Sequence, residues 1–422
     1  MSRETAYIIE TSRRIAPFDD PVGEVLIGQK PLRVRQHEAL TALGFDVRGA
    51  ARMEDIPASA YPCLVLTDDL YFNVSALREF LGAARRAAGS SQCATRNDTV
   101  FARIFNPLHA DQSEGRNRFP LHYLKAPGAQ VNELLIDIGE YPFPIYIPPH
   151  MRGPMDIAFP ACLRPLMRIT HAVELLFANL ACIHVRVAEV FASPRRRLSL
   201  ALRAMSTNPA RVLARMNRIG PGCQIHPTAW LEGAELGANV QIGAYAVVRM
   251  SRIGDGCQIG DGSVVKHSVV GSGSVLFNDL TLGFAVCYPE TFLIHGPYHL
   301  SIFGRSSAMF ATILDDFRLD GKPIRIMKDG KLTPYPFPFL GSFIGHRTRV
   351  AGGSIIGPGR SIPNDLLIFP PPDGVLNRIP DGLPRGVPLF IHGGGLGEAP
   401  GLPSTLPEVE RANGRGNPAR DF

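Results

Sequence analysis

Aliphatic residues recur at fixed intervals in the second half of the chain. Between residues 219 and 276 they stand six residues apart in successive sets, and each set starts 17 residues after the one before. The positions are Ile219, Ile225, Leu231, Leu236, Ile242, Val248, Ile253, Ile259, Val265, Val270 and Leu276. This period is typical of a parallel β-helix, in which each hexad forms one short strand and one turn and three hexads close a triangular coil. We expect the aliphatic side chains to point into the coil.

A glycine follows many of these aliphatic residues. The glycines are Gly220, Gly237, Gly243, Gly254, Gly260 and Gly271. Glycine adopts positive φ without the steric penalty that a Cβ brings. We therefore expect these glycines to occupy positive-φ turns at the corners of the coil, where a Cβ would clash.

The first 200 residues show a different pattern, which predicts an α/β domain. Short apolar runs at 6–9, 63–66 and 134–138 indicate strands, whereas 32–43 and 74–88 indicate helices that end near a glycine. The apolar stretch 169–192 has apolar residues three and four apart and several charged residues, so it predicts an amphipathic helix and no membrane span.

These patterns divide the chain into four parts. We expect an α/β domain over 1–200, a basic linker helix over 201–217 and a β-helix over 218–372. A loop near 305–340 projects from the β-helix, because the repeat is interrupted there and resumes at Ile344. The tail 373–422 is rich in Pro and Gly and is expected to be mostly irregular.

Charge and cysteine content add little to this picture. The 44 basic and 38 acidic residues leave a net charge of +6, partly in a local basic run at 195–197. Such a run can attract phosphate or nucleotide groups or form a solvated helix face, and no nucleic-acid-binding motif accompanies it. The seven cysteines form no Cys-x-x-Cys pair, and no signal-peptide pattern opens the chain, so we expect a cytoplasmic protein with reduced thiols.

Three segments in the repeat region resemble a known family in their order. They are the segment from His299 to Gly304, the segment from Ala311 to Lys322 and the segment from Leu340 to Gly345. Over about 218–368 this order resembles the bifunctional sugar-1-phosphate nucleotidylyltransferase/acetyltransferases of bacteria and archaea. The resemblance implies a left-handed β-helix, acetyl-CoA as co-substrate, a sugar or sugar phosphate as acceptor and a homotrimer.

The N-terminal half resembles the nucleotidyltransferase domain of the same family more weakly. The similar segments are Ala6–Ile9, Lys30-Pro31-Leu32 and Leu66-Thr67-Asp68-Asp69. The resemblance implies that Asp68 or Asp69 holds Mg²⁺. The family's glycine-rich loop, whose backbone N–H groups cradle a triphosphate, is replaced here by residues 10–17, which contain no glycine. We therefore expect a degenerate nucleotidyltransferase-like domain without nucleotidyl transfer.

Acyl transfer from coenzyme A requires a base for the acceptor hydroxyl or amine, and histidine suits this role near neutral pH. The resemblance places the base at His299, and His346 is a second candidate. Ile302 stands where the family has Tyr. Asp316, Lys322 and Arg325 fall at or near the loop positions that contact the sugar phosphate in the family. His267 and His295 are weaker candidates.

The sequence predicts acyl, in the first instance acetyl, transfer to a sugar, sugar phosphate or nucleotide sugar. Two alternatives stay open: a sugar-nucleotide-binding or regulatory protein without catalysis, and a residual sugar-1-phosphate nucleotidyltransferase that uses Asp68 and Asp69. A zinc enzyme with three histidine ligands is a further class, but His295, His299 and His346 lack the spacing that would support it.

Overall fold

The computed structural model describes residues 4–106, 108, 112–113, 115–144, 158–376, 389–393 and 395–398. The chain forms two compact units, Met1–Ile368 and Phe369–Phe422. Within the second unit, the 3-10 helix η4 (Pro372–Gly374) is followed by a hairpin of β41 (Leu389–His392) and β42 (Gly395–Glu398). The tail that we expected to be irregular therefore contains an antiparallel strand pair.

A mixed β-sheet forms the N-terminal half of the first unit, with strand order β12-β9-β11-β7-β1-β6 and β10 paired to β11. Strands β7, β1 and β6 run parallel to one another, with β6 at the edge of the sheet, while β11 runs antiparallel to both β7 and β9. The strands are β1 (Thr5–Ile9), β6 (Asp46–Ala50), β7 (Cys63–Thr67), β9 (Ser90–Arg96), β10 (Gln112–Ser113), β11 (Arg116–Leu124) and β12 (Val131–Leu135). All three predicted strands are present, and the third begins three residues earlier than predicted.

Helices α1 (Leu32–Ala42) and α2 (Val74–Arg86) match the two helices that the sequence predicts. Asn73 caps α2, because its side chain accepts a hydrogen bond from the backbone N–H of Ala76 at 2.8 Å. A short helix, α3 (Val100–Phe105), follows β9 and packs against β14 (Ala158–Cys162).

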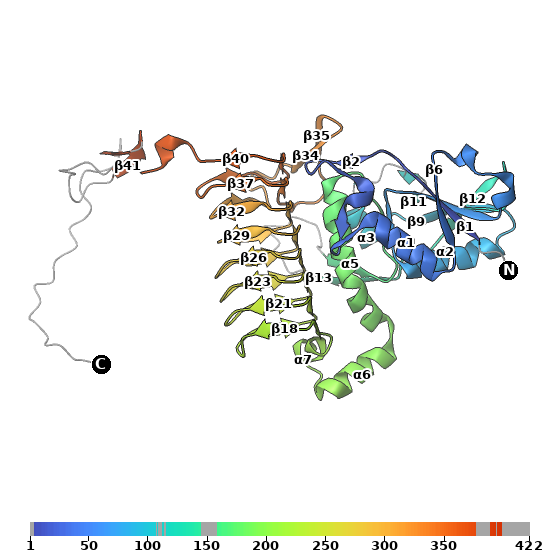
Figure 1. Ribbon diagram of the computed structural model, residues 1–422, viewed down its shortest axis with the longest axis horizontal. Helices are drawn as coiled ribbons and strands as arrows, with labels where there is room; N and C mark the ends of the chain where they lie inside the picture. Colours follow the sequence, from blue (N-terminus) through green and yellow to red (C-terminus); the bar gives the residue numbers. More distant parts are fainter. Residues whose placement is uncertain are drawn as a thin grey trace, which may run out of the picture. The chain divides into compact units, whose positions relative to one another are not determined.

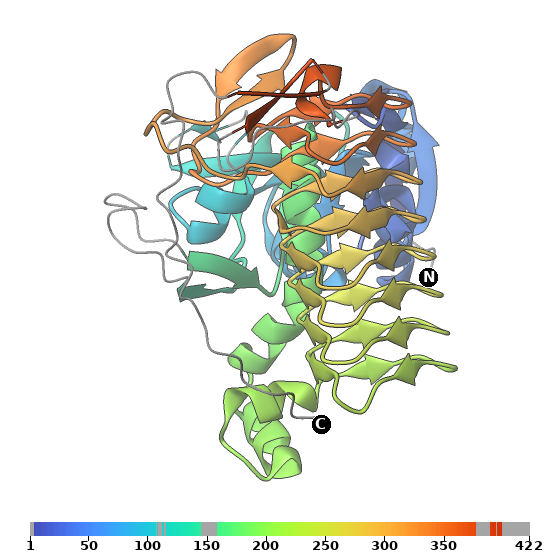
Figure 2. The ribbon, with the colours of Figure 1, turned by 90° about the vertical axis from the view of Figure 1, so that its left-hand side faces the viewer.

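The long helix α5 (Ala172–Ala192) connects the two halves of the first unit (Figures 1 and 2). It begins with a capping box in which the His171 side chain accepts from the backbone of Val173 and Glu174 accepts from the backbone of His171. The predicted helix is thus present, but it is buried nearly all around rather than on one face. The reason is that the N-terminal half covers one side of the helix and the β-helix covers the other.

The chain between α5 and the β-helix forms two short helices instead of the single linker helix that we expected. They are α6 (Pro194–Ala204) and α7 (Pro209–Ala214). Met205, at φ 48°, ends α6 in the left-handed region, and a proline at the start of α7 fixes a new helix start.

The β-helix begins at Arg218, and its strands form three faces, each a sheet of parallel strands; Figure 2 shows the coils stacked one above another. The first face consists of β16 (Arg218–Ile219), β19 (Glu235–Leu236), β22 (Arg252–Ile253), β25 (Val269–Val270), β28 (Val286–Cys287), β31 (Ile302–Phe303), β36 (Phe343–Ile344) and β39 (Ser361–Ile362). The second face consists of β17 (Gln224–Ile225), β20 (Gln241–Ile242), β23 (Gln258–Ile259), β26 (Val275–Leu276), β29 (Phe292–Ile294), β32 (Ala308–Phe310), β37 (Arg349–Val350) and β40 (Leu367–Ile368). The third face consists of β18 (Trp230–Glu232), β21 (Val247–Arg249), β24 (Val264–Lys266), β27 (Thr281–Gly283) and β30 (Tyr298–His299).

The strand register confirms the repeat read from the sequence. Residues 17 positions apart pair in neighbouring coils, as Gln224 does with Gln241 and Gln241 with Gln258. The aliphatic positions point inward as expected: Leu276, Val265 and Val270 are fully buried in one continuous core. These repeated parallel strands are consistent with a left-handed β-helix.

The glycines of the repeat serve a different purpose from the one we expected. The positive-φ residue of the corner stands two positions later, for example at Asn239, Tyr245 or Gly256, and none of the six glycines has positive φ. A Cβ on Gly271 would lie 2.4 Å from the backbone N of Pro289 in the next coil. The glycines are therefore required because neighbouring coils approach closely, and not because of their φ angle.

The coil is interrupted after β33 (Ile313–Leu314), which pairs with β38 (Ile355–Ile356) beyond the insertion. Strands β31, β32 and β33 continue the coil through Leu314, so the projecting segment starts at 315 and not near 305. Residues 315–342 form this segment, which carries the hairpin of β34 (Arg325–Lys328) and β35 (Lys331–Pro334).

Candidate functional site

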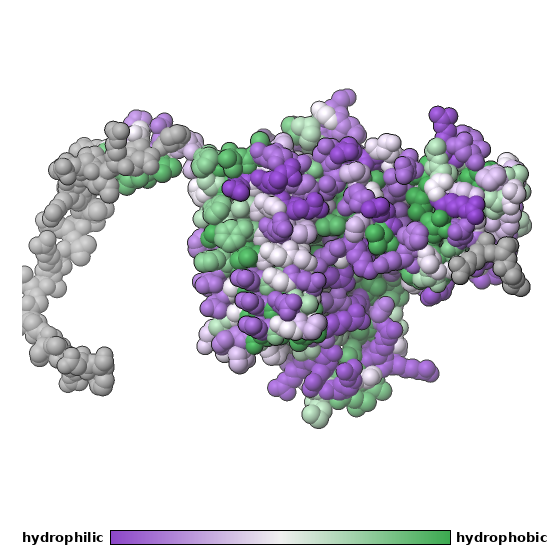
Figure 3. Space-filling view, in the orientation of Figure 1, coloured by the Kyte–Doolittle hydropathy of each residue, from purple (hydrophilic) through white to green (hydrophobic). Residues whose placement is uncertain are grey.

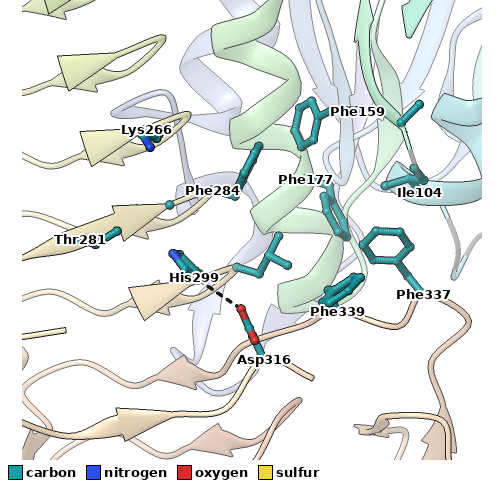
Figure 4. A pocket seen from close by; sticks show the side chains of 13 residues that line it. Ile104, Phe159, Phe177, Lys266, Thr281, Phe284, His299, Asp316, Phe337 and Phe339 are labelled. Atoms are coloured by element: carbon teal, nitrogen blue, oxygen red, sulfur yellow. Dashed lines mark hydrogen bonds and ion pairs between the residues drawn. The ribbon is translucent and has the colours of Figure 1, made fainter. Parts of the chain in front are cut away.

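A pocket of about 230 Å³ lies where the third face of the β-helix meets α5 and the projecting segment (Figure 4). The β-helix contributes His299 and Lys266, and the projecting segment contributes Asp316. The N-terminal half contributes the opposite wall, with Phe159 on β14 and Phe177 on α5. The site therefore combines residues that lie more than 100 positions apart in the sequence.

His299 stands at the end of β30, at the edge of the third face. In the preceding coil its register partner is Gly283, and a Cβ at that position would lie 2.7 Å from Cδ2 of the His299 ring. Gly283 thus leaves the space that the imidazole needs. The His299 side chain is 40% exposed, so it is open to a ligand in the pocket.

Asp316 is the partner of His299. Its Oδ2 lies 3.3 Å from His299 Nδ1, and its own backbone O accepts a hydrogen bond from the N–H of Leu340 at 2.8 Å. The rings of Phe317 and Phe339 stack at 5.1 Å and hold the two ends of the projecting segment together. Because a carboxylate only accepts, a neutral His299 donates from Nδ1 and keeps the lone pair on Nε2. Asp316 thus positions His299, whereas the sequence led us to expect it to contact the substrate.

Lys266 is a residue that the sequence analysis missed. Arg249, Lys266, Gly283 and His299 pair in register on four successive coils of the third face. Coils of a β-helix are about 4.8 Å apart, so the two cations form a column that leads away from His299. The 17- and 16-residue steps between these positions are the signal that would have revealed it.

His346, the second candidate base, is buried and both of its ring nitrogens are engaged. Nδ1 accepts from the backbone N–H of Arg305 at 2.8 Å, and Nε2 lies 3.1 Å from Oδ2 of Asp20. The ring also lies against Phe18 and Tyr288 at 5.4 Å each. His346 thus joins the β-helix to the N-terminal half, and it lies apart from the His299 pocket.

His267, one of the weaker candidates, contacts a second histidine. Its Nδ1 lies 2.8 Å from Nε2 of His184 on α5, and Nδ1 of His184 lies 2.6 Å from the carbonyl O of Leu180. Burial lowers the pKa of both imidazoles, that of His267 to about 4, and the nearby Lys266 adds to the effect. The pair stays neutral at pH 7 and packs beside the pocket wall, because His267 stacks on Phe284 at 4.7 Å.

The other predicted residues lie outside this pocket. Lys322 and Arg325 are exposed on the projecting segment, and His295, the other of the two weaker candidates, is exposed at a corner with φ 54°. Among the described residues, no three His, Cys, Asp or Glu side chains group together so that they could hold a metal ion.

The two aspartates proposed for Mg²⁺ are held by protein groups. Asp68 accepts hydrogen bonds from the backbone and side chain of Thr11, at 3.0 and 2.7 Å. Asp69 is fully buried and pairs with Arg168 at 2.8 Å and with Arg13 at 3.5 Å. Arg13 and Arg168 already neutralise the negative charge of Asp69 that would attract a cation. These residues therefore do not fit a Mg²⁺ site.

A second pocket, of about 570 Å³, lies at the carboxyl ends of β1, β6 and β7. Asp68 forms part of its lining, together with the loop after β1, which contains no glycine, and several arginines. The arginines are Arg13, Arg14, Arg33 and Arg48. In α/β sheets the carboxyl ends of the parallel strands are the usual place for a ligand.

No single helix of the described chain is long and apolar enough to cross a membrane; Ala172–Val190 and Pro194–Ala204 reach that standard only as a pair bent by 86°. No protein family model and no curated protein matches the sequence. Among solved structures, the acetyltransferase domain of PglB from Neisseria gonorrhoeae FA1090 matches at 15% identity with a TM-score of 0.13, over 42% of this chain and 63% of that chain. The same domain in complex with acetyl coenzyme A matches at 16% identity with a TM-score of 0.14, over 49% of this chain and 65% of that chain. The chain thus spans less than two thirds of these structures, and a likeness at this level does not extend to the site described above.

Proposed function

We propose that the protein is an acyltransferase that moves an acyl group from coenzyme A to a hydroxyl or amine of a sugar, sugar phosphate or nucleotide sugar. The observation that supports this proposal is the pairing of His299 with Asp316 at the mouth of a pocket. A histidine oriented by a carboxylate is the arrangement that general-base catalysis of acyl transfer requires.

In the proposed reaction, Nε2 of His299 takes the proton from the acceptor hydroxyl or amine while the acceptor attacks the thioester carbonyl. The C–S bond then breaks, and the departing thiolate takes the proton back from the imidazolium. Asp316 stays ionised, holds the ring in the productive tautomer and stabilises the imidazolium while it exists. A new C–O or C–N bond replaces the thioester, so the reaction needs no further reagent.

The charges around the pocket suggest where the phosphate groups bind. Lys266 and Arg249 extend from His299 along the third face, and such a column of cations suits the phosphates of coenzyme A. Lys322 and Arg325 are exposed on the projecting segment, and they would meet a sugar phosphate only beyond the pocket lining. We assign the first two to the donor and keep the last two as candidate contacts of the acceptor.

The test is the release of free thiol from acyl-CoA in the presence of a panel of sugars and sugar phosphates. The variant His299→Ala should lower the rate by about 10²- to 10⁴-fold and leave coenzyme A binding intact. The variant Asp316→Asn should lower kcat more than it raises KM, because the carboxylate orients the base and does not bind the donor. His295→Ala, in the same coil, is the matched control and should behave as wild type. Equal activity of His299→Ala and wild type would overturn the assignment.

We also propose a homotrimer, built through the second face of the β-helix. This face carries exposed aromatic residues in two of its coils, Phe277 at 47% and Phe310 at 38% exposure. Figure 3 shows hydrophobic patches on the upper coils of the β-helix. Sedimentation should show a trimer for the wild type and a smaller species for Phe277→Glu. A wild-type monomer at micromolar concentration would rule this assembly out.

The second pocket supports an alternative function, the binding of a nucleotide sugar without nucleotidyl transfer. Each of its four arginines pairs with a carboxylate and would exchange that partner for a phosphate oxygen of the ligand, and the size of the pocket suits a small organic ligand. Calorimetry with nucleoside diphosphate sugars in the absence of Mg²⁺ tests this alternative. Binding that Arg33→Ala abolishes, together with unchanged acyl transfer, would indicate that the two pockets have separate roles.

A further inference from the structure

The His299 pocket differs from a sugar-binding site in the character of its lining. Of its 13 lining residues, four carry polar side chains, and those four lie on the β-helix and at the start of the projecting segment. The remainder of the wall is formed mainly by phenylalanine rings. Five of them line it: Phe159, Phe177, Phe284, Phe337 and Phe339. Figure 4 shows Phe159, Phe177, Phe337 and Phe339 on the side of the pocket away from the β-helix coils, and Phe284 nearer to the coils that carry His299.

The phenylalanine wall is held in place by its own contacts. Phe159 and Phe177 are almost fully buried, and Phe159 packs on Phe284 at 4.9 Å between ring centroids. Phe337 and Phe339 contact each other edge to face at 5.9 Å. The wall is therefore a fixed surface, and it offers a ligand no hydrogen-bonding group.

An acetyl group does not account for a space of this size. An apolar cavity of about 150 Å³ accommodates a benzene ring, and this pocket has a volume of about 230 Å³. The single methyl group of an acetyl thioester would leave most of the phenylalanine wall without a contact. An apolar group of about six to eight carbons would fill the pocket.

We propose that the donor used at this site carries an aliphatic or aromatic acyl group of about six to eight carbons, which packs against the phenylalanine wall while its carbonyl lies beside His299. This inference rests on the proposed acyl transfer. The apolar group belongs to the donor because the sugar acceptor has hydroxyls on every side. A hydroxyl buried against the rings without a partner would cost binding free energy, whereas an acyl chain has no such group.

The test uses coenzyme A thioethers, which bind but cannot transfer their chain. Binding of S-ethyl-, S-hexyl- and S-hexadecyl-coenzyme A to the full-length protein is measured by calorimetry. Each methylene group buried against the wall tightens binding by about fourfold. We expect S-hexyl-coenzyme A to bind between about tenfold and 200-fold more tightly than the S-ethyl compound, and the S-hexadecyl compound to gain nothing further.

The variant Phe337→Ser, at the half-buried rim, should reduce the chain-length dependence, because it weakens binding of S-hexyl-coenzyme A more than binding of S-ethyl-coenzyme A. Leu319→Ser, at a highly exposed apolar residue of the same projecting segment that does not line the pocket, is the control and should behave as wild type. Equal affinity for the ethyl and hexyl compounds would overturn the inference and leave acyl transfer standing. Absence of binding by any coenzyme A thioether would overturn both. Chain-length dependence for alkyl glycosides in place of the thioethers would assign the apolar wall to the acceptor and refute the inference.

Discussion

The neutral histidine pair between α5 and the β-helix predicts a loss of stability in mild acid. The hydrogen bonds define a single neutral arrangement, in which Nδ1–H of His184 donates to the carbonyl of Leu180 and Nε2 accepts from His267 Nδ1–H. Lys266 and Arg249 lie near His267 and oppose any further positive charge. Acidification must therefore either leave the pair uncharged or break it.

The sign and size follow from the lowered pKa of His267. A histidine in an unfolded chain has a pKa of about 6.5, whereas burial lowers that of His267 to about 4. Below about pH 6.5 the unfolded chain binds a proton that the folded protein does not, so stability falls as the pH decreases towards 4. A fully shielded ring would lose about 2 kcal/mol at pH 5. His184 is fully buried, but His267 is only half-buried, so solvent partly screens its charge. We therefore expect the free energy of unfolding to fall by about 1 to 2 kcal/mol at pH 5.

The assay compares the urea unfolding of wild type and His267→Gln at pH 8 and at pH 5. The titrating groups outside the His184–His267 pair are common to both proteins, so the difference between their pH-dependent losses reports on this pair. Wild type should lose about 1 to 2 kcal/mol more than the variant between the two pH values. His226→Gln, an exposed histidine of the β-helix, should retain the full wild-type loss. The reasoning would be refuted if His267→Gln lost stability as wild type does.

Two further predictions concern the close approach of the coils and the buried aspartate. In thermal unfolding, Gly271→Ala should destabilise the protein by about 2 kcal/mol or more, because the added Cβ would lie 2.4 Å from the backbone N of Pro289. Gly357→Ala is the control and should be neutral or slightly stabilising in the same assay, because nothing lies within 4 Å of its added Cβ. Asp69→Asn should destabilise the fold by about 1 to 3 kcal/mol, because it leaves Arg168 without its buried partner. Millimolar MgCl₂ should leave the wild-type melting temperature unchanged, and a rise that Asp69→Asn abolishes would contradict this account.

The sequence predicts the β-helix well because the environment of each position recurs every coil. Leu276 and Val265 take part in one continuous core, and a period of six and 17 residues records that core directly in the sequence. The reason for the glycines was nevertheless wrong. Close approach between coils and positive φ both favour glycine, and a sequence pattern does not distinguish them.

The candidate site is only partly predictable for the same reason. His299 lies in the repeat, and Asp316 follows it by 17 residues. This is the length of one coil, so the carboxylate at the start of the projecting segment lies beside Nδ1 of His299. Phe159 and Phe177 reach the pocket through tertiary packing that leaves no periodic signal. His346 illustrates the converse, because a histidine in a repeat pattern looks equally suitable as a base whether it faces a pocket or, as here, Asp20 of the N-terminal half.

The contact between the two halves changes how the N-terminal half should be understood. The first face of the β-helix presents Val269, Val286, Ile302 and Phe343 outward, and all four are buried in one core with α5. That face cannot be exposed without uncovering a continuous apolar surface, so the two halves are a single folding unit rather than two enzymes joined by a linker. The same packing places α5 and β14 opposite His299. The N-terminal half therefore supplies Phe159 and Phe177, the part of the apolar wall that faces His299 from outside the β-helix, and the proposed acyl specificity depends in part on it.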